Sequence, residues 1–449
     1  MIEGILIGLQ TALSLKNILM VMMGCFFGTI IGMLPGLGPM TAIALMIPIT
    51  YGFEPSTGLI LMAGVYYGAV FGGSTSSILI NAPGVPGTVA TAFDGYPMAQ
   101  QGKAGKALAI AAYSSFAGGT ISAIFLLFAA PSLSKVSLAF RSPDYFALMV
   151  LGLTAVSAFS SKGQFLKAMM MVILGLMLAT VGQDSLSDIT RFTFNNMNLT
   201  DGISFVLVVM ATFAMSEALT IILKAKDPSR ATEQISLSQL GSIKLDRDER
   251  NKMLKSIPRS SILGFLIGVL PGAGATIASF LAYGMERNYV NEEEKQKFGK
   301  GSVHGLSAPE TANNAACSGS FVPLLTLGIP GSGTTAVMLG ALLGFGIQPG
   351  PRLYQTNPEI FWSVIMSMYI GMVVLLILNL PLIPYIARIL AVPRNYLIPL
   401  ILFFSVTGIY LMSFNNFDIF LMIGIAIIAT FLYLATLSAK RKSPSPITG

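Results

Sequence analysis

The stretch GMLPGLG at residues 32–38 interrupts a long apolar segment of the chain. Proline removes a backbone donor and glycine has a poor helix preference, so a helix that breaks here leaves N–H and C=O groups without partners. Hydrocarbon cannot satisfy such groups, and a break at membrane depth is tolerated where it lines a cavity or is buried in protein. The stretch therefore predicts a discontinuous helix beside a polar space.

The composition predicts an all-α polytopic membrane protein. Of 449 residues, 53% are hydrophobic and 10% are charged, against about 25% charged in a typical soluble domain. Apolar stretches long enough to span a bilayer recur along the chain, which indicates about 10–12 transmembrane segments, some of them discontinuous or re-entrant. The formal net charge of +7 does not indicate nucleic acid, because the basic residues lie between apolar segments.

The chain repeats its own breaks. GMLPGLG returns as GVLPGAG at residues 268–274, an offset of 236, and aligning Pro83 with Pro330 gives a second offset of 247. A polar insertion at 286–300 accounts for the difference. We predict a first transmembrane repeat at 1–223 and a second at 259–439, which we expect to be inverted copies, although hydropathy also allows parallel ones.

The remaining segments are polar. Nine of the 27 Lys and Arg residues lie between 224 and 259, so we predict a cytoplasmic linker at 224–258 and a cytoplasmic tail at 440–449. The helices predicted from the apolar runs cover 17–34, 40–49, 58–80, 104–130, 145–160, 165–181, 203–223, 262–270, 276–284, 317–327, 334–345, 360–380, 396–412 and 419–437.

The candidate substrate and ion ligands gather at the four breaks. Hydroxyl and carbonyl oxygens can coordinate a small cation, while helix N-termini receive carboxylates. Small polar residues in membrane helices also serve helix packing, which is an equally good interpretation of any single serine. The predicted ligands are Pro35, Gly36, Gly38, Thr41, Ser74, Thr75, Ser76, Asn81, Pro83, Gly84, Thr88, Gly272, Gly274, Thr276, Glu310, Asn313, Asn314, Pro330, Gly331, Thr334 and Thr335.

Three titratable residues near the breaks allow more than one interpretation. Glu310 is either a helix-capping or interfacial residue, or a proton or cation ligand, because an ionisable group inside a membrane is costly. His304, the only histidine, is expected in a loop near the interface, with a proton relay as the less favoured alternative. Asp94 is expected at the membrane surface in an ordinary solvated role. No second histidine or cysteine stands at ligand spacing, so we expect no metal site.

The sequence carries no catalytic motif that would indicate an enzyme. It has no HExxH, no P-loop lysine and no GxSxG in a strand-to-helix context. An intramembrane acid–base pair of Glu310 and His304 is disfavoured, because a spacing of six residues does not place them on one helical face. We expect neither catalytic residues nor a cofactor.

The chain contains four long motifs: GMLPGLGPMTAIALMIPIT, YYGAVFGGSTSSILINAPGVPGTVATAFDGYPMAQQGKAGKAL, GVLPGAGATIASF and APETANNAACSGSFVPLLTLGIPGSGTTAVMLGALL. In these motifs it resembles the large membrane subunit of the bacterial tripartite tricarboxylate transporters. The resemblance runs from about Leu15 to the final helix and implies a secondary transporter in the bacterial inner membrane. It further implies a small membrane subunit, a periplasmic solute-binding protein, carboxylate substrates such as citrate, and coupling to an ion gradient.

Together, the breaks and the resemblance favour a symporter that holds a carboxylate at the N-termini of half-helices. These half-helices should begin near Met40, Thr88, Thr276 and Thr334. The coupling ion is left open between Na⁺ and H⁺. The alternatives are a passive channel and a non-transporting membrane assembly subunit, since small residues and broken helices also build pores.

Overall fold

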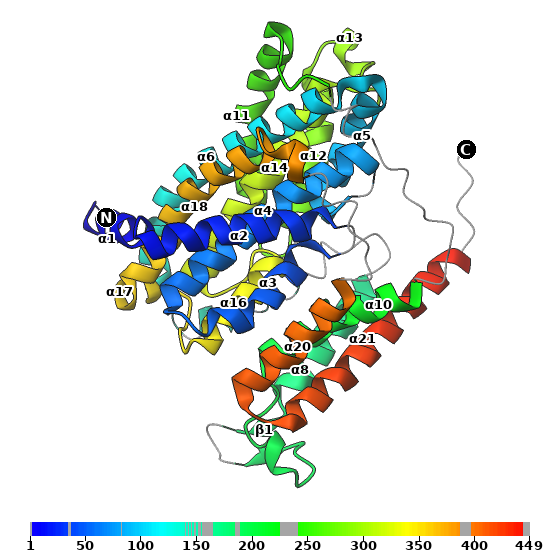
Figure 1. Ribbon diagram of the computed structural model, residues 1–449. Helices are drawn as coiled ribbons and strands as arrows, with labels where there is room; N and C mark the ends of the chain where they lie inside the picture. Colours follow the sequence, from blue (N-terminus) through cyan, green and yellow to red (C-terminus); the bar gives the residue numbers. More distant parts are fainter. Residues whose placement is uncertain are drawn as a thin grey trace. The chain divides into compact units, whose positions relative to one another are not determined.

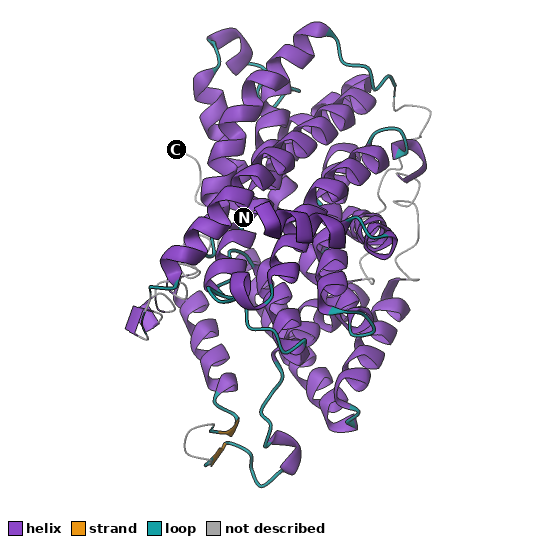
Figure 2. Cartoon of the chain, turned by 90° about the vertical axis from the view of Figure 1, so that its left-hand side faces the viewer, coloured by secondary structure: helices purple, strands orange, loops and turns teal. Residues whose placement is uncertain are grey.

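The computed structural model describes most of the chain. The described residues are 2–34, 37–81, 83–139, 165–184, 189–224, 241–386 and 397–442, with single positions between 141 and 154. They are almost entirely helical (Figures 1 and 2). Within them, the only sheet is a two-stranded antiparallel pair of β1 (Gly182–Gln183) and β2 (Thr190–Arg191), in which Gly182 lies opposite Arg191.

The protein is an all-α polytopic membrane protein, as predicted. Five helices of the described residues are long and apolar enough to cross a bilayer, and several shorter apolar helices accompany them. The long candidates lie at Leu15–Met33, Pro55–Ile80, Pro86–Val136, Pro358–Asn379 and Asn416–Leu434.

The chain divides into two compact units, which are described separately. The larger unit comprises 1–174 and 232–392, and the smaller unit comprises 175–231 and 393–449. Both units draw on both halves of the sequence, so this division differs from the division into repeats at 223 and 259.

The larger unit holds the four breaks. Its elements in the first half are α1 (Ile2–Ala12), α2 (Leu15–Met33), α3 (Gly38–Thr50), α4 (Pro55–Ile80), η1 (Pro86–Thr88), α5 (Val89–Met98), η2 (Ala99–Lys103) and α6 (Ala104–Ser137). Those in the second half are α11 (Arg247–Val269), α12 (Gly274–Tyr289), α13 (Glu292–Lys295), α14 (Val303–Gly319), α15 (Phe321–Leu327), α16 (Gly333–Gly344), α17 (Leu353–Thr356), α18 (Pro358–Asn379) and α19 (Ile383–Ile386).

The smaller unit is also helical. The boundary between the units falls inside α8 (Phe165–Ala179). After α8, the smaller unit contains η3 (Met197–Leu199), α9 (Phe205–Val209), η4 (Met210–Met215), α10 (Ser216–Lys224), α20 (Leu397–Ser413) and α21 (Asn416–Lys442), beside the two strands. The Asn415 side chain donates to Asn198 Oδ1 at 2.9 Å within this unit.

Glycine governs how α2 packs on α4. The two helices lie side by side in Figure 1 and make the most extensive helix–helix contact among the described elements. A Cβ atom added at Gly28 would overlap the Val65 carbonyl oxygen, and one added at Gly32 would overlap that of Ala69. Such close backbone approach is what small residues allow in membrane helices.

The second half repeats this contact at the predicted offsets. A Cβ at Gly264 would overlap the Ala312 carbonyl oxygen, and one at Gly268 would overlap that of Ala316. Gly264 and Gly268 follow Gly28 and Gly32 by 236, whereas Ala312 and Ala316 follow Val65 and Ala69 by 247. The α11–α14 contact therefore uses the same register as the α2–α4 contact.

Several predicted boundaries differ from the structure. The helix predicted to begin at 262 begins at Arg247, inside the predicted linker, because Asp246 and Glu249 form a capping box there. The stretch 303–316 was not predicted to be helical, because its polar residues obscure the pattern, yet it forms α14. Most of the helix predicted at 145–160, and residues 225–240 of the predicted linker, lie outside the described residues.

Replacing a helical glycine with alanine should have opposite effects on stability inside and outside the tight α2–α4 contact. Replacing Gly28 with alanine should lower the free energy of unfolding by about 1–3 kcal/mol, because the new methyl group has no space. Replacing Gly284 of α12, which has no neighbouring atom within 4 Å, should instead raise it by about 0.5–1 kcal/mol through helix propensity. Thermal unfolding of both variants in the same lipid or detergent checks this, and a stabilised Gly28→Ala protein would contradict it.

Candidate functional site

The four helix breaks lie together in the larger unit. Gly38 lies beside Gly84, because a Cβ at Gly38 would be 4.0 Å from the Gly84 carbonyl oxygen. The Gly272 N–H donates to the Gly331 carbonyl oxygen at 3.1 Å. The two pairs of breaks are joined in turn, since a Cβ at Gly333 would be 2.7 Å from Met40 Sδ. Breaks separated by hundreds of residues in sequence thus form one cluster.

Left-handed glycines make the turn at the first and third breaks. Gly38 has φ +66° and Gly274 has φ +65°, a region that side chains rarely adopt. Each opens a new helix, α3 and α12, after a short extended turn at Leu34 or Leu270. The predicted discontinuous helices are confirmed at these positions, and the reason is the glycine that permits the turn.

Three of the four helix N-termini at the cluster have no side-chain cap. α3, the continuous helix formed by η1 and α5, and α12 begin without a side chain that accepts from their first turn. α16 differs, because Ser332 and Thr335 form a capping box. An uncapped N-terminus presents free N–H donors and about half a positive charge, so three ends of this cluster can receive an anion.

Asn313 lies against this cluster with an unused amide. Its side chain is 1% exposed, and neither Oδ1 nor Nδ2 has a hydrogen-bond partner. A Cβ at Gly87 would be 2.5 Å from Asn313 Oδ1, so the backbone of η1 passes directly over the amide. Asn314 Nδ2 donates to the Glu310 carbonyl oxygen at 3.0 Å, while its Oδ1 is also without a partner. Buried amides are usually paired, so these atoms are free for a ligand.

Glu310 is held by three hydroxyl groups from three different helices. Ser74 Oγ of α4 and Ser115 Oγ of α6 donate to Glu310 Oε2 at 2.7 and 2.8 Å, and Thr91 Oγ1 of α5 donates to Oε1. The carboxyl group is fully buried inside α14. It lies in the middle of a helix and not at a helix cap, and it is buried; its role as a proton or cation ligand stays a prediction.

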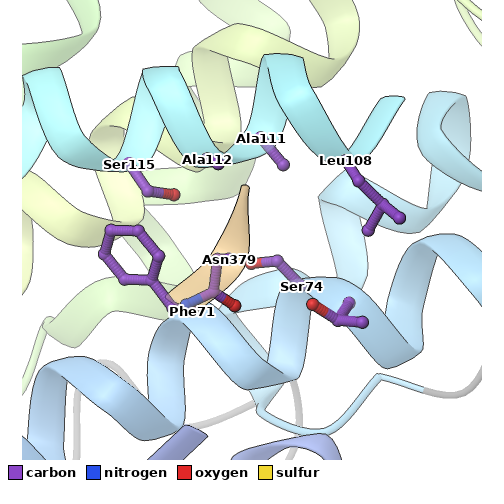
Figure 3. A pocket seen from close by; sticks show the side chains of 8 residues that line it. Phe71, Ser74, Leu108, Ala111, Ala112, Ser115 and Asn379 are labelled. Carbon is purple, nitrogen blue, oxygen red and sulfur yellow. The ribbon is translucent and has the colours of Figure 1, made fainter. Parts of the chain in front are cut away.

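A small cavity adjoins this carboxyl group. It offers about 10 Å³ to the centre of a water-sized sphere, close to the minimum that one water molecule needs. In Figure 3, Asn379 at the end of α18 projects between α4 and α6, toward Ser74 and Ser115. The lining residues are Phe71, Ser74, Thr75, Leu108, Ala111, Ala112, Ser115 and Asn379.

The other predicted ligands occupy varied positions. Asn81 ends α4 in a left-handed conformation and its side chain is exposed, away from the buried cluster. Ser76 donates to the Gly73 carbonyl oxygen and Thr88 to that of Val85, both within their own segment.

The remaining predicted ligands differ in burial. Thr41 and Thr334 are buried in the first turns of α3 and α16, Thr276 is half-buried, and Pro83 and Pro330 are half-buried in their loops. Pro35 and Gly36 lie outside the described residues.

Three residues of the site were missed from the sequence. Thr91, Ser115 and Asn379 lie outside the four breaks, and each is a polar residue within an apolar helix. The pair Ser114-Ser115 in the middle of a long apolar run was a usable signal. Its relation to Glu310 could not be found, because the contact joins residues 195 positions apart.

Two titratable residues expected at the surface are buried instead. Asp94 is 0% exposed, and its Oδ1 accepts from the backbone N–H groups of Gly299, Gly301 and Ser302 at 2.7–2.9 Å. His304 lies in the first turn of α14, 6% exposed, rather than in a loop. Asp94 is covered because residues 299–302 fold onto it, whereas the His304 side chain packs against Ser256 of α11 and Glu286 of α12.

Glu286 centres a small ion-pair network near this corner. Arg259 Nη2 donates to its Oε1 at 2.7 Å, Ser256 Oγ donates to the same oxygen at 2.8 Å, and His304 Nδ1 lies 3.0 Å away. Glu286 belongs to α12, which is not among the long candidate spans. Burial raises the pKa of Glu286, but the hydrogen bonds from His304, Arg259 and Ser256 outweigh it and lower the pKa to about 2.

Comparisons with known proteins give one family and two relatives. A model described as the tripartite tricarboxylate transporter TctA family matches residues 18–440. A protein of Agrobacterium vitis, named "Uncharacterized 52.8 kDa protein in TAR-I ttuC' 3'region", is 42% identical over 432 residues, which cover 96% of this chain and 84% of that protein. A second protein of that organism, "Uncharacterized protein in TAR-II ttuC' 3'region", is 44% identical over 160 residues, 36% of this chain and 65% of that protein. No solved structure matches.

The network around Glu286 predicts a loss of stability when its cation is removed. Arg259→Met should lower the free energy of unfolding by up to about 3 kcal/mol, because it leaves a buried carboxylate with less compensation. Since the pKa of Glu286 is lowered from 4.5 to about 2 in the folded state, its contribution is complete above pH 4.5 and is lost as the pH falls toward 2. Thermal unfolding against pH measures both effects, and the double variant Arg259→Met with Glu286→Leu should recover part of the loss.

Proposed function

The chain belongs to the tripartite tricarboxylate transporter TctA family, and on this premise we propose that it carries a carboxylate across the bacterial inner membrane, driven by an ion gradient. It is a multi-pass membrane protein of a transporter family. The proposal makes it the large subunit of a tripartite system, working with a small membrane subunit and a periplasmic solute-binding protein that delivers the substrate.

The observation that carries this proposal is the unpaired amide of Asn313 at the junction of the breaks. A buried amide without partners costs free energy unless a ligand satisfies it. Its Nδ2 can donate to a carboxylate oxygen beside Gly87 of the second break, and the uncapped helix N-termini of the same cluster of breaks offer further donors. A multiply charged organic acid matches such a set of distributed donors.

The electrostatics support an anionic substrate held without a full positive charge. The buried charged or titratable residues of the described chain include no lysine or arginine. Each uncapped helix end provides about half a positive charge, so several ends together attract a carboxylate while permitting its release. A permanent buried cation would bind the anion more tightly and slow the release that transport requires.

The matching helix contacts of the two halves support a mechanism in which one half moves against the other. The α2–α4 and α11–α14 contacts match at the offsets of 236 and 247, which favours two internally repeated halves. In transporters, a site at a repeat interface opens alternately to the two sides when one repeat moves against the other. We propose the same cycle here, with Na⁺ or H⁺ as the coupling ion.

Uptake into vesicles tests the proposed function directly. The chain is reconstituted with its small membrane subunit and solute-binding protein, and labelled citrate uptake is measured under separately imposed sodium and proton gradients. Accumulation against the citrate gradient is expected of a coupled carrier. A passive channel would only equilibrate citrate, and an assembly subunit would neither transport it nor be stabilised by it.

Replacing Asn313 with leucine should separate binding from stability. The change removes both unpaired amide atoms at nearly constant volume, so we expect the thermal stability to be unchanged or raised. Citrate uptake should fall by about tenfold or more, because the substrate loses a buried donor worth about 1–3 kcal/mol. If Asn313 had a purely structural role, the Asn313→Leu protein would instead lose thermal stability and keep its citrate uptake.

The matched control is Asn251→Leu, at an exposed position of α11. It makes the same chemical change outside the cluster, so uptake should be preserved. Unchanged uptake in the Asn313→Leu protein would remove the amide from the proposed site.

A further inference from the structure

Glu310 is a buried carboxyl group without a cationic partner. It lies in the middle of α14 with a relative exposure of 0%, and the buried residues of the described chain include no lysine or arginine. An isolated buried carboxylate is costly, so such a group either pairs with a cation or takes up a proton. The surrounding atoms decide between these outcomes.

The hydroxyl groups around Glu310 can satisfy it in either protonation state. Ser74 Oγ lies 2.7 Å from Glu310 Oε2 and also 3.2 Å from the Val70 carbonyl oxygen. When the carboxyl is ionised, the Ser74 hydroxyl donates to Oε2. When Oε2 carries a proton, it donates that proton to Ser74 Oγ, whose own hydrogen turns to Val70. Only a hydroxyl rotation separates the two arrangements.

The spacing of the oxygens fits a proton better than a metal cation. Ser74 and Ser115 already lie at hydrogen-bond distance from Oε2, at 2.7 and 2.8 Å. A cation the size of Ca²⁺, which is close to that of Na⁺, keeps its oxygens at about 2.3–2.6 Å from itself and therefore spreads them apart. The adjoining cavity has room for about one water molecule but not for a coordination shell.

This cavity gives the carboxyl group a neighbouring place for water. Ser74 and Ser115, which bind Oε2, both line it, and so does Asn379. Asn379 is 4% exposed, and its Oδ1 has no hydrogen-bond partner in the protein (Figure 3). A water molecule here has the polar partners it needs, namely Asn379 Oδ1 and the two serine hydroxyls.

We propose that Glu310 is a proton-binding site, which exchanges its proton with a water molecule held beside Asn379, Ser74 and Ser115. On loading, a proton from the solution protonates this water. One O–H bond of the resulting hydronium then breaks as an O–H bond forms on a carboxylate oxygen of Glu310, which leaves neutral water and a neutral carboxylic acid. On release, the same O–H bond breaks and the proton returns to the water. No other bond changes, and the only reactant besides the protein and this water is the proton that the solution supplies.

The titratable groups on the elements packed against Glu310 are engaged elsewhere or remain uncharged. Cys317 lies two turns along α14 and is a buried free thiol. Tyr67 contacts Ser318, and Asp94 binds residues 299–302. Among the other groups on these elements, Tyr66 contacts Ser332, Lys106 pairs with Glu249, and Arg259 and His304 both contact Glu286.

The repeat makes this site unique within the chain. At the offset of 247, the position matching Glu310 is Ala63 of α4, so the first half has no equivalent carboxyl group. Glu310 of the second half is bound by Ser74, Thr91 and Ser115 of the first half. If the proposed transport function holds, a site that joins the halves in this way couples one proton to each cycle.

Infrared difference spectroscopy tests proton binding without any transported substrate. The full-length chain in lipid vesicles is titrated with acid, and the C=O stretch of a buried, protonated carboxylic acid is followed. The unmodified protein should gain this band on acidification, and Glu310→Gln should lose it. Glu293→Gln, at an exposed carboxyl group of α13, is the matched control and should keep it.

A further variant and two further measurements distinguish the ways in which the proton-binding proposal and the transport proposal could fail. Ser74→Ala should keep the band but move its midpoint to higher pH by about one to two units, because the ionised form loses a donor. A band that persists in Glu310→Gln, or one that sodium removes at constant pH, would overturn the proposal. Failure of citrate uptake alone would count against the transport function and leave the proton site standing.

Discussion

A backbone polar group buried in an apolar environment must find a partner, and this constraint organises the larger unit. Each break frees N–H and C=O groups that lipid cannot satisfy. The structure answers by bringing the breaks together, as in the bond from the Gly272 N–H to the Gly331 carbonyl oxygen. Because that solution leaves the N-termini of α3, α5 and α12 uncapped, the cluster keeps a surplus of donors. We propose that this surplus of donors binds the anionic substrate.

Close packing of glycine-bearing helices makes the cluster possible. Breaks can meet only if the helices that carry them lie close together, and Gly28 and Gly264 allow this in the two halves. Both glycines lie against a carbonyl oxygen of the neighbouring helix. The same residue type therefore serves two purposes: at Gly38 it permits a turn, and at Gly28 it permits contact.

Buried polar chemistry is distributed unevenly over this repeated frame. The α2–α4 and α11–α14 contacts match in register, yet Glu310 of α14 has alanine, Ala63, at the matching position of α4. Its hydroxyl partners come from α4, α5 and α6, so the hydrogen bonds of the carboxyl group depend on how all three helices pack against α14. A movement between these helices would change the hydrogen bonds of Glu310, which offers a physical route from proton binding to conformational change.

The sequence by itself determined the class of protein, the positions of the four breaks and the internal offsets, because hydropathy, proline and glycine act locally along the chain. It also indicated Glu310 and Asn313, since polar residues stand out in apolar surroundings. It could not determine that α14 is helical, that Asp94 is buried, or that Ser115 and Asn379 belong beside Glu310. Those facts depend on contacts between residues far apart in the chain, and only the tertiary structure decides which distant side chains share a buried space.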